Sequence, residues 1–144
     1  YEISNFAKEG FESKHNSDCW KQKEYIGIGT AAHSYLNNMR FSNTENLDEY
    51  IKNINENNFD KNITVHEKQT METKQKEYMI LGLRRLEGIC IRNFKNQFGQ
   101  NPIFLYHKEL EKLVKEDLLE IDGDYIRLTE KGLDLANIVW EEFI

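Results

Sequence analysis

The chain has 144 residues, of which 39% are hydrophobic and 31% charged, a composition that supports one ordinary core or two small ones and excludes a disordered chain. Its net charge of -6 disfavours the broad basic surface that nucleic acids and anionic membranes attract. No apolar run approaches the ~20 residues that cross a bilayer, and Cys19 and Cys90 are too few and too far apart for a disulfide framework or a set of thiolate ligands. These features predict a cytoplasmic protein without a membrane span.

The first 44 residues have the patterns of strands and loops. Residues 1–6 alternate between apolar and polar side chains, which predicts a strand to about Lys8, and residues 25–29 predict a second strand. Both are short edge-type segments whose neighbours would have to come from elsewhere, so residues 1–44 are not expected to form a closed domain alone. Because the strand pattern begins at Tyr1 with no methionine or flexible leader, we expect a fragment of a longer protein. A homodimer of this fragment is a further expectation.

A short amphipathic helix and an asparagine-rich segment follow. Apolar side chains recur at helical spacing, at Leu47, Tyr50, Ile51 and Ile54. Asn46 and Glu49 have the spacing of a helix-capping pair. Residues 53–62 contain five asparagines and little apolar content, which is typical of a linker. The chain is therefore divided into two predicted domains, residues 1–62 and residues 63–144.

The second domain begins with three predicted helices. The first starts at about Met71, has an apolar stripe, and is expected to stop at Gly88. The next helix is short and stops at Gly99. Asn101 and Pro102 then supply a cap and a first-turn proline for the third helix.

A hairpin and a closing helix complete this domain. Residues 119–121 and 125–128 alternate like strands and are joined by a glycine-containing turn. Thr129 offers a cap for a last helix that reaches Phe143. Three helices, a hairpin and a closing helix make a winged-helix-like arrangement. The predicted fold class is α+β, with a strand-containing first part and a helical second part.

A winged helix often reads DNA, so a nucleic-acid-binding module is one functional hypothesis. Its candidate recognition helix, residues 102–117, contains basic side chains at Lys108, Lys112 and Lys115. It also contains acidic side chains at Glu109, Glu111, Glu116 and Asp117. These would repel a phosphate backbone nearly as strongly as the lysines attract it, which favours a structural or protein-contacting role.

The segment from His15 to Trp20 is one of two that could have a chemical role. It places an imidazole, an amide, a thiol and an indole within six residues, on His15, Asn16, Cys19 and Trp20. Imidazole and thiolate are both axial ligands of haem iron, and an indole could pack against the macrocycle. The structural alternative makes Trp20 a core residue and Cys19 a small buried one, with His15 and Asn16 capping a turn.

The second such segment is rich in small residues. It contains Gly27, Gly29, Thr30, Ala32, His33 and Ser34. Small side chains let a backbone approach a ligand or another strand closely, so this segment is a candidate for lying near a ligand. It is neither a dinucleotide nor a phosphate-binding loop. His33 and Ser34 are adjacent on a strand and would point to opposite faces, which argues against a nucleophile and base pair.

Residues 1–8, 15–20 and 27–35 resemble the HemW family in the order and spacing of their motifs. Residues 77–84, Glu87-Gly88, Phe94, Phe98-Gly99 and 128–132 look like the C-terminal domain shared by HemW and coproporphyrinogen dehydrogenase relatives. HemW proteins are radical S-adenosylmethionine family members. The resemblance therefore implies a parent protein whose partial barrel binds a [4Fe-4S] cluster and S-adenosylmethionine. It makes residues 1–44 the tail of that barrel, and the short helix and the asparagine-rich segment complete the first part, residues 1–62.

The cluster needs three closely spaced cysteines, so no cofactor is expected in this fragment, and radical chemistry is predicted to be absent from it. In the family the motif around His15 is HNxxYW and is suspected of haem handling; here Cys19 stands at the tyrosine position. The resemblance implies haem or a porphyrinogen as the partner of the complete protein. The histidine-bearing motif is closer to HemW than to the oxidases, which favours haem trafficking over porphyrinogen oxidation.

Overall fold

The computed structural model describes residues 1–144, which form two compact units. One unit combines Tyr1–Gln22 with Thr73–Ile144, and the other is Lys23–Glu72. Residues 1–44 thus do not close on themselves, as expected, because their two parts belong to different units. The compact units change at residues 22/23 and 72/73, and the predicted division at residues 62 and 63 stays a prediction.

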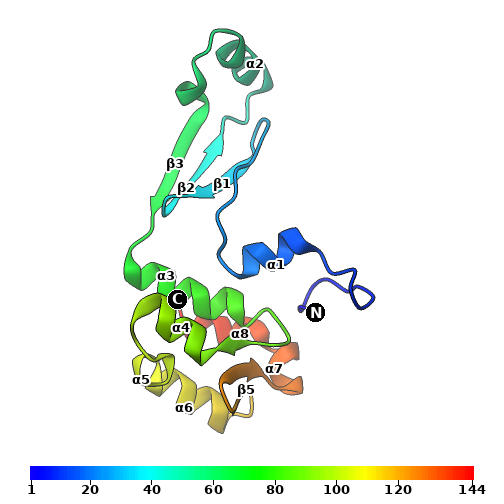
Figure 1. The fold of residues 1–144 in the computed structure, drawn as a ribbon, viewed down its shortest axis with the longest axis vertical. Helices are drawn as coiled ribbons and strands as arrows, with labels where there is room; N and C mark the ends of the chain where they lie inside the picture. The colour runs from blue at the N-terminus through cyan, green and yellow to red at the C-terminus, as the bar shows by residue number, and fades with distance from the viewer. The chain divides into compact units, whose positions relative to one another are not determined.

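The unit Lys23–Glu72 is a small antiparallel sheet with a helical excursion (Figure 1). Its elements in chain order are β1 (His33–Leu36), β2 (Met39–Asn43), α2 (Leu47–Asn55), the 3-10 helix η1 (Phe59–Asn62) and β3 (Ile63–Lys68). The strand order is β1-β2-β3, and the pairing shifts by one residue between Arg40 and Phe41 of β2. The helix α2 begins as predicted, since the Asn46 side chain accepts a 3.0 Å hydrogen bond from the Glu49 N–H.

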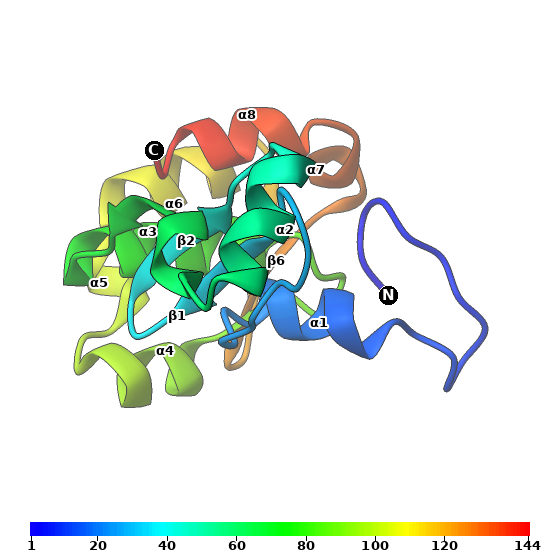
Figure 2. The ribbon, with the colours of Figure 1, turned by 90° about the horizontal axis from the view of Figure 1, so that it is seen from above.

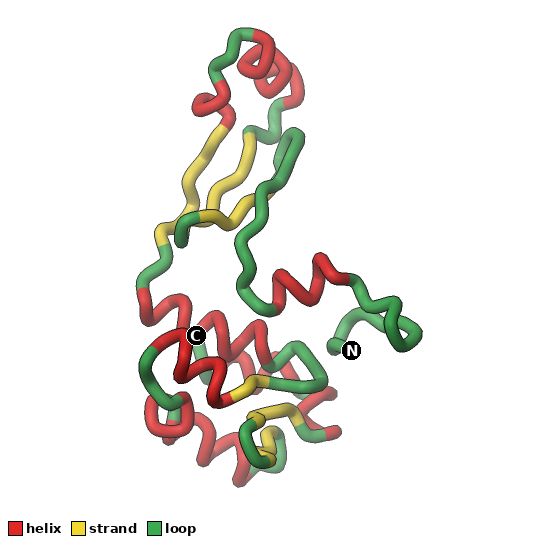
Figure 3. Tube along the Cα trace, in the orientation of Figure 1, coloured by secondary structure: helices red, strands yellow, loops and turns green.

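Three predictions for the first 68 residues are wrong. Residues 1–13 contain no strand, and Figure 3 shows the stretch from the N-terminus to the first helix as loop. Glu2 makes only an isolated bridge to Arg85, and Tyr25 makes one to Tyr35. Residues 53–62 are not a linker, because α2 and η1 occupy most of them and lead directly into β3. Alternation by itself could not show whether a neighbouring strand was present to pair with.

The other unit is built mainly from helices. Its elements are α1 (Lys14–Trp20), α3 (Met71–Gly82), β4 (Ile89–Cys90), α4 (Ile91–Phe98), α5 (Pro102–Leu105), α6 (His107–Lys115), β5 (Leu119–Asp122), β6 (Tyr125–Leu128), α7 (Glu130–Asp134) and α8 (Ala136–Glu141). The three strands form a sheet in the order β4-β6-β5, and the predicted hairpin is β5 with β6. Figure 2 shows α1 after a strand-free loop that starts at the N-terminus.

Caps predicted from the sequence define several helix ends in this unit. The Asn101 side chain accepts a 2.9 Å hydrogen bond from the Ile103 N–H, and Thr129 Oγ1 accepts one of 3.0 Å from the Gly132 N–H. Gly99 ends α4 in the left-handed conformation, at a φ of 71°. These contacts are local in sequence, which is why short patterns predicted them.

Gly88 is needed for a reason other than the predicted one. The helix α3 ends at Gly82, six residues earlier, so Gly88 is not its stop. It has a φ of 77°, and a Cβ atom there would lie 2.2 Å from the carbonyl oxygen of Ile126. A side chain at this position would therefore collide with the backbone of β6.

The core of this unit draws apolar side chains from its helices and from all three strands. The buried cluster comprises Met79, Leu83, Ile89, Phe94, Phe98, Tyr106, Leu110, Leu113, Leu118, Leu119, Ile126, Leu128, Ala136, Val139 and Phe143. Phe94 lies at the centre of an aromatic group, with its ring centroid 4.7 Å from that of Phe98 and 6.4 Å from that of Tyr106. The helical stripes read from the sequence therefore face one another in a single core.

Two predicted helices are each divided in the structure. The helix predicted over residues 102–117 breaks at Tyr106, which has a φ of -112°, and the closing helix breaks at Leu135, which has a φ of -115°. At each break the residue ends one helix and begins the next: the Tyr106 N–H donates to the Pro102 carbonyl and the Tyr106 carbonyl accepts from the Leu110 N–H, while Leu135 makes the same two kinds of bond with Lys131 and Val139.

Candidate functional site

The helix α1 carries the first group of candidate residues, and Ser13 determines where it starts. The Ser13 side chain accepts a 3.2 Å hydrogen bond from the Asn16 N–H, so Ser13 is the N-cap. His15 and Asn16 are consequently in the first helical turn, and the alternative in which they cap a turn is wrong. Residues four apart on a helix share a face, which places His15 beside Cys19.

The His15 and Cys19 side chains are close enough to interact. Their Nε2 and Sγ atoms are 3.7 Å apart, His15 is exposed, and Cys19 is half-buried without a disulfide partner. A neutral imidazole and a thiolate are both ligands for soft or borderline metal ions, including haem iron. The pair can thus offer one nitrogen and one sulfur ligand from a solvent-accessible helix face.

Trp20, the last residue of α1, packs against arginine. The guanidinium carbon of Arg84 lies 4.4 Å from the centroid of the Trp20 ring and 4.9 Å from that of the Trp140 ring. Trp20 is half-buried, so it belongs to the boundary of the unit and not to its central cluster. Packing of this indole on a macrocycle stays a prediction.

The small-residue segment folds back on its own hairpin. The Gly27 N–H donates to Ser34 Oγ over 3.0 Å, and the Asn43 amide donates to the Gly29 carbonyl over 2.7 Å. A Cβ atom on Gly27 would lie 2.2 Å from the carbonyl oxygen of His33, so the close backbone approach that was predicted for this segment is made to β1. Thr30 also bonds within the unit, through Oγ1 to the carbonyl of Thr44. The proposed nearness of Ala32 and this whole segment to a ligand stays a prediction.

Sequence reasoning missed a histidine pair on the sheet. His33 is exposed while Ser34 is buried, so the two do point to opposite sides. The ring of His33 stacks on that of His66, with centroids 5.5 Å apart, and His66 Nε2 lies 2.7 Å from Ser42 Oγ. Only the strand register brings these residues together, since His66 belongs to β3, a strand that the sequence pattern had not indicated.

The structure and the cysteine count also bear on metal sites, iron-sulfur clusters and membrane spans. The described residues 1–144 contain no group of three or more His, Cys, Asp or Glu side chains arranged for a metal ion. Cys19 on α1 and Cys90 on β4 are the two cysteines, so the chain lacks the three thiolates that hold a [4Fe-4S] cluster. None of the helices has the length and apolar character needed to cross a bilayer.

Comparisons with known proteins identify relatives of both halves of the chain. Residues 70–135 match the HemN C-terminal domain. Over its full length the chain is 36% identical to "Heme chaperone HemW" of Lactococcus lactis and 37% identical to the protein of the same name from Bacillus subtilis. It spans 37% and 38% of the lengths of these two relatives. A protein from Danio rerio, "Radical S-adenosyl methionine domain-containing protein 1, mitochondrial", is 28% identical over 96% of the chain.

A solved structure has a similar fold. It is that of the Escherichia coli protein described as "Coproporphyrinogen III oxidase (HemN)" and as a radical SAM enzyme. The match has a TM-score of 0.67 and an identity of 18%, and it covers 84% of this chain and 28% of the solved one. The predicted mixture of helices and sheet is therefore confirmed, and this solved structure has a similar fold.

Proposed function

We propose that this chain belongs to the HemW-like proteins, that it is the C-terminal part of a haem chaperone, and that α1 contacts the haem. The proposal is supported by relatives named as haem chaperones, which are 36% and 37% identical over the whole chain, and by the match of residues 70–135 to the HemN C-terminal domain. The observation that carries this proposal is the exposed His15, with Nε2 3.7 Å from Cys19 Sγ on one face of α1. Haem is here the cargo that is bound and released.

The ligand chemistry of this pair suits reversible binding. The two axial positions of a haem lie on opposite faces of the macrocycle, so one helix face offers a single axial ligand at a time. His15 would bind iron as neutral imidazole through one ring nitrogen, and a hydrogen bond to the other nitrogen would orient the ring. Cys19 would bind as thiolate, the form in which cysteine is a metal ligand. A single ligand on an exposed helix leaves the haem accessible to an acceptor.

Haem handling is favoured over porphyrinogen oxidation by the comparisons. The relatives named as haem chaperones are 36% and 37% identical to the chain, whereas the oxidase structure is 18% identical. In the proposal, a [4Fe-4S] cluster and S-adenosylmethionine belong to the rest of the complete protein, and this part has no radical activity of its own.

The architecture in this proposal is a winged-helix-like unit preceded by the tail of a partial barrel, with the residues 1–62 and 63–144 as its two parts. The helices α3 to α6 and the β5-β6 hairpin support the winged-helix description. DNA binding is not favoured by the surface of α6, where the lysines alternate with Glu109, Glu111 and Glu116. Location in the cytoplasm and a homodimer of this part are further components of the proposal.

A haem titration of the complete protein tests the proposed site. Wild type, His15→Ala and Cys19→Ala are compared by absorbance, with His107→Ala as a control, since His107 is an exposed histidine on α6. We expect His15→Ala to weaken haem binding about tenfold or more and to shift the Soret band, because removing the axial ligand changes the field at iron. Equal affinities and identical Soret bands in wild type and both α1 variants would place the ligand elsewhere.

A further inference from the structure

The helix α1 is too short to hold its own position. It has seven residues, none of which is buried, and no acidic side chain in its first turn. Isolated helices shorter than about 12 residues are marginal in water, so α1 depends on contacts to the rest of its unit. Those contacts are made at its C-terminal end, by Trp20 and by Gln22, whose side-chain amide donates to the Lys74 carbonyl over 3.1 Å.

Arg84 makes the contact with Trp20 and does so with two aromatic rings at once. Its guanidinium carbon lies 4.4 Å and 4.9 Å from the ring centroids of Trp20 and Trp140. The buried indole N–H groups of both tryptophans make no hydrogen bond, so ring faces and not hydrogen bonds hold these side chains. A flat, charged guanidinium suits such a contact better than an ammonium does.

The N-terminal segment holds Arg84 in turn. The Glu2 side chain is fully buried, and its carboxylate lies 3.9 Å from the Arg84 guanidinium. The Ser4 N–H donates to this carboxylate over 3.0 Å, and Arg84 Nη2 donates to Ser4 Oγ over 2.7 Å. The Ile3 N–H donates to the Arg84 carbonyl over 3.1 Å. A buried carboxylate must stay paired, so Glu2 fixes Arg84 and Arg84 fixes Trp20.

We propose that Arg84 is a positioning residue for the His15–Cys19 pair, acting through Trp20. Trp20 follows Cys19 directly, so the Arg84 contact determines which way this face of α1 points and keeps α1 helical. The inference rests on the proposed function for haem contact, but its first consequence is the order of α1 and can be measured without haem. Arg84 comes from the turn after α3, and no sequence pattern links it to the His15 motif.

The first experiment measures amide hydrogen exchange in the complete protein without haem. We expect Arg84→Met to accelerate exchange in a peptide covering residues 14–20 about tenfold while leaving a peptide from α6 unchanged. Arg84→Lys is a second variant that keeps a positive charge opposite Glu2, so it tests the contact even if Arg84→Met does not fold. Because an ammonium lacks the flat face of the guanidinium, we expect faster exchange in residues 14–20 of this variant too, by a smaller factor. The control is Arg92→Met, which removes an exposed arginine paired with Asp124 at 2.5 Å in the same unit.

The second experiment is the haem titration with the same variants. Arg84→Met should weaken haem binding about tenfold and shift the Soret band towards that of His15→Ala, whereas Arg92→Met should match wild type. Unchanged exchange in α1, or equally faster exchange in α1 and α6, overturns the positioning role whatever haem does. If Arg84→Met exchanges faster in α1 but binds haem like wild type, while His15→Ala loses affinity, then Arg84 does not affect haem binding. If His15→Ala also binds normally, the proposed haem site fails while Arg84 remains the anchor of α1.

Discussion

In the unit made of Tyr1–Gln22 and Thr73–Ile144, apolar side chains from four helices and three strands meet in one core, whereas Lys23–Glu72 buries mostly polar ones. The buried side chains of Lys23–Glu72 are Ser34, Tyr35, Ser42, Asn53, Asn62 and Gln69. Several of its apolar residues are instead exposed, at Ile26, Ile28, Ile51, Ile54 and Val65. The unit of Tyr1–Gln22 and Thr73–Ile144 is thus stabilised mainly by the transfer of apolar surface from water. The unit Lys23–Glu72 is stabilised mainly by hydrogen bonds, each of which contributes less net free energy than the burial of a large apolar side chain.

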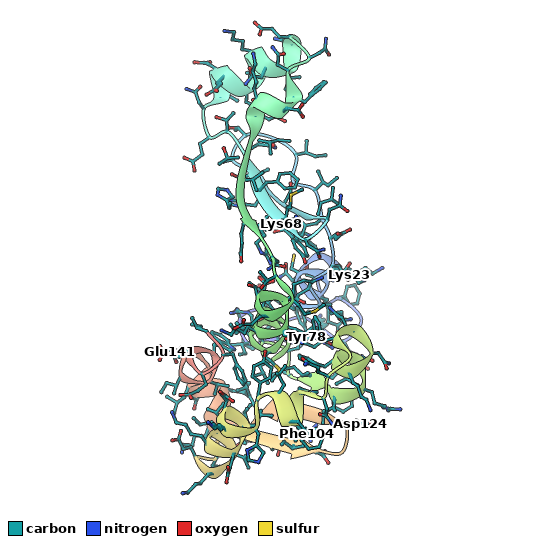
Figure 4. All side chains as sticks on the ribbon, turned by 90° about the vertical axis from the view of Figure 1, so that its left-hand side faces the viewer. Lys23, Lys68, Tyr78, Phe104, Asp124 and Glu141 are labelled. Atoms are coloured by element: carbon teal, nitrogen blue, oxygen red, sulfur yellow. The ribbon has the colours of Figure 1, made fainter.

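The largest predicted effect is in the apolar core. Phe94→Ala removes a fully buried ring that contacts the rings of Phe98 and Tyr106, and should lower the free energy of unfolding by about 3–5 kcal/mol. Denaturant unfolding measures the loss. The matched control is Phe104→Ala, since Phe104, labelled in Figure 4, is 79% exposed and should change stability by less than about 0.5 kcal/mol. Similar losses in both variants would contradict the assignment of the core.

A smaller effect is expected from the polar interior of Lys23–Glu72. The Asn53 amide donates to Asn62 Oδ1 over 2.8 Å, and both side chains are buried. Asn53→Ala leaves the Asn62 oxygen without this donor and should cost about 1–3 kcal/mol. Hydrogen exchange should accelerate in α2 and not in α4, with Asn55→Ala, an exposed change on the same helix, as the control. Equal acceleration in α4 would mean that the two units unfold together.

The smallest predicted effect is the contribution of Tyr78 to the pH dependence of stability at alkaline pH. Burial raises the pKa of Tyr78 above its usual value of 10.0; the charge of Arg85 opposes this shift and Cys90 reinforces it. The neutral phenol therefore stabilises the fold fully below about pH 10, and this contribution is lost as the pH rises through the raised folded pKa. Tyr78→Phe should lose less stability than wild type between about pH 9 and pH 11. Parallel pH profiles for the two proteins would show that Tyr78 does not report on core burial.

The sequence by itself determined the features that depend on neighbouring residues. Helix caps at Asn46, Asn101 and Thr129 were predicted because the capping side chain and the N–H it accepts from lie within three residues of each other. The β5-β6 hairpin and the end of α4 at Gly99 followed from turn chemistry. Helical periodicity likewise located part of the core, including Met79, Phe94, Leu110 and Val139. In each case a short stretch of chain contains the whole physical cause.

Only the tertiary structure decided the features whose partners are distant in sequence. The strand β3 is exposed along its whole length, so it has no buried face to produce a pattern, and its pairing with β2 is what brings His66 to His33. The opening strand was predicted from alternating side chains, but residues 1–13 form no strand because no neighbouring strand pairs with them. Arg84 and Trp20 are 64 positions apart, and Arg84 also pairs with the buried carboxylate of Glu2. Burial of a charge and stacking of a ring are properties of the folded chain, and no local run of residues encodes them.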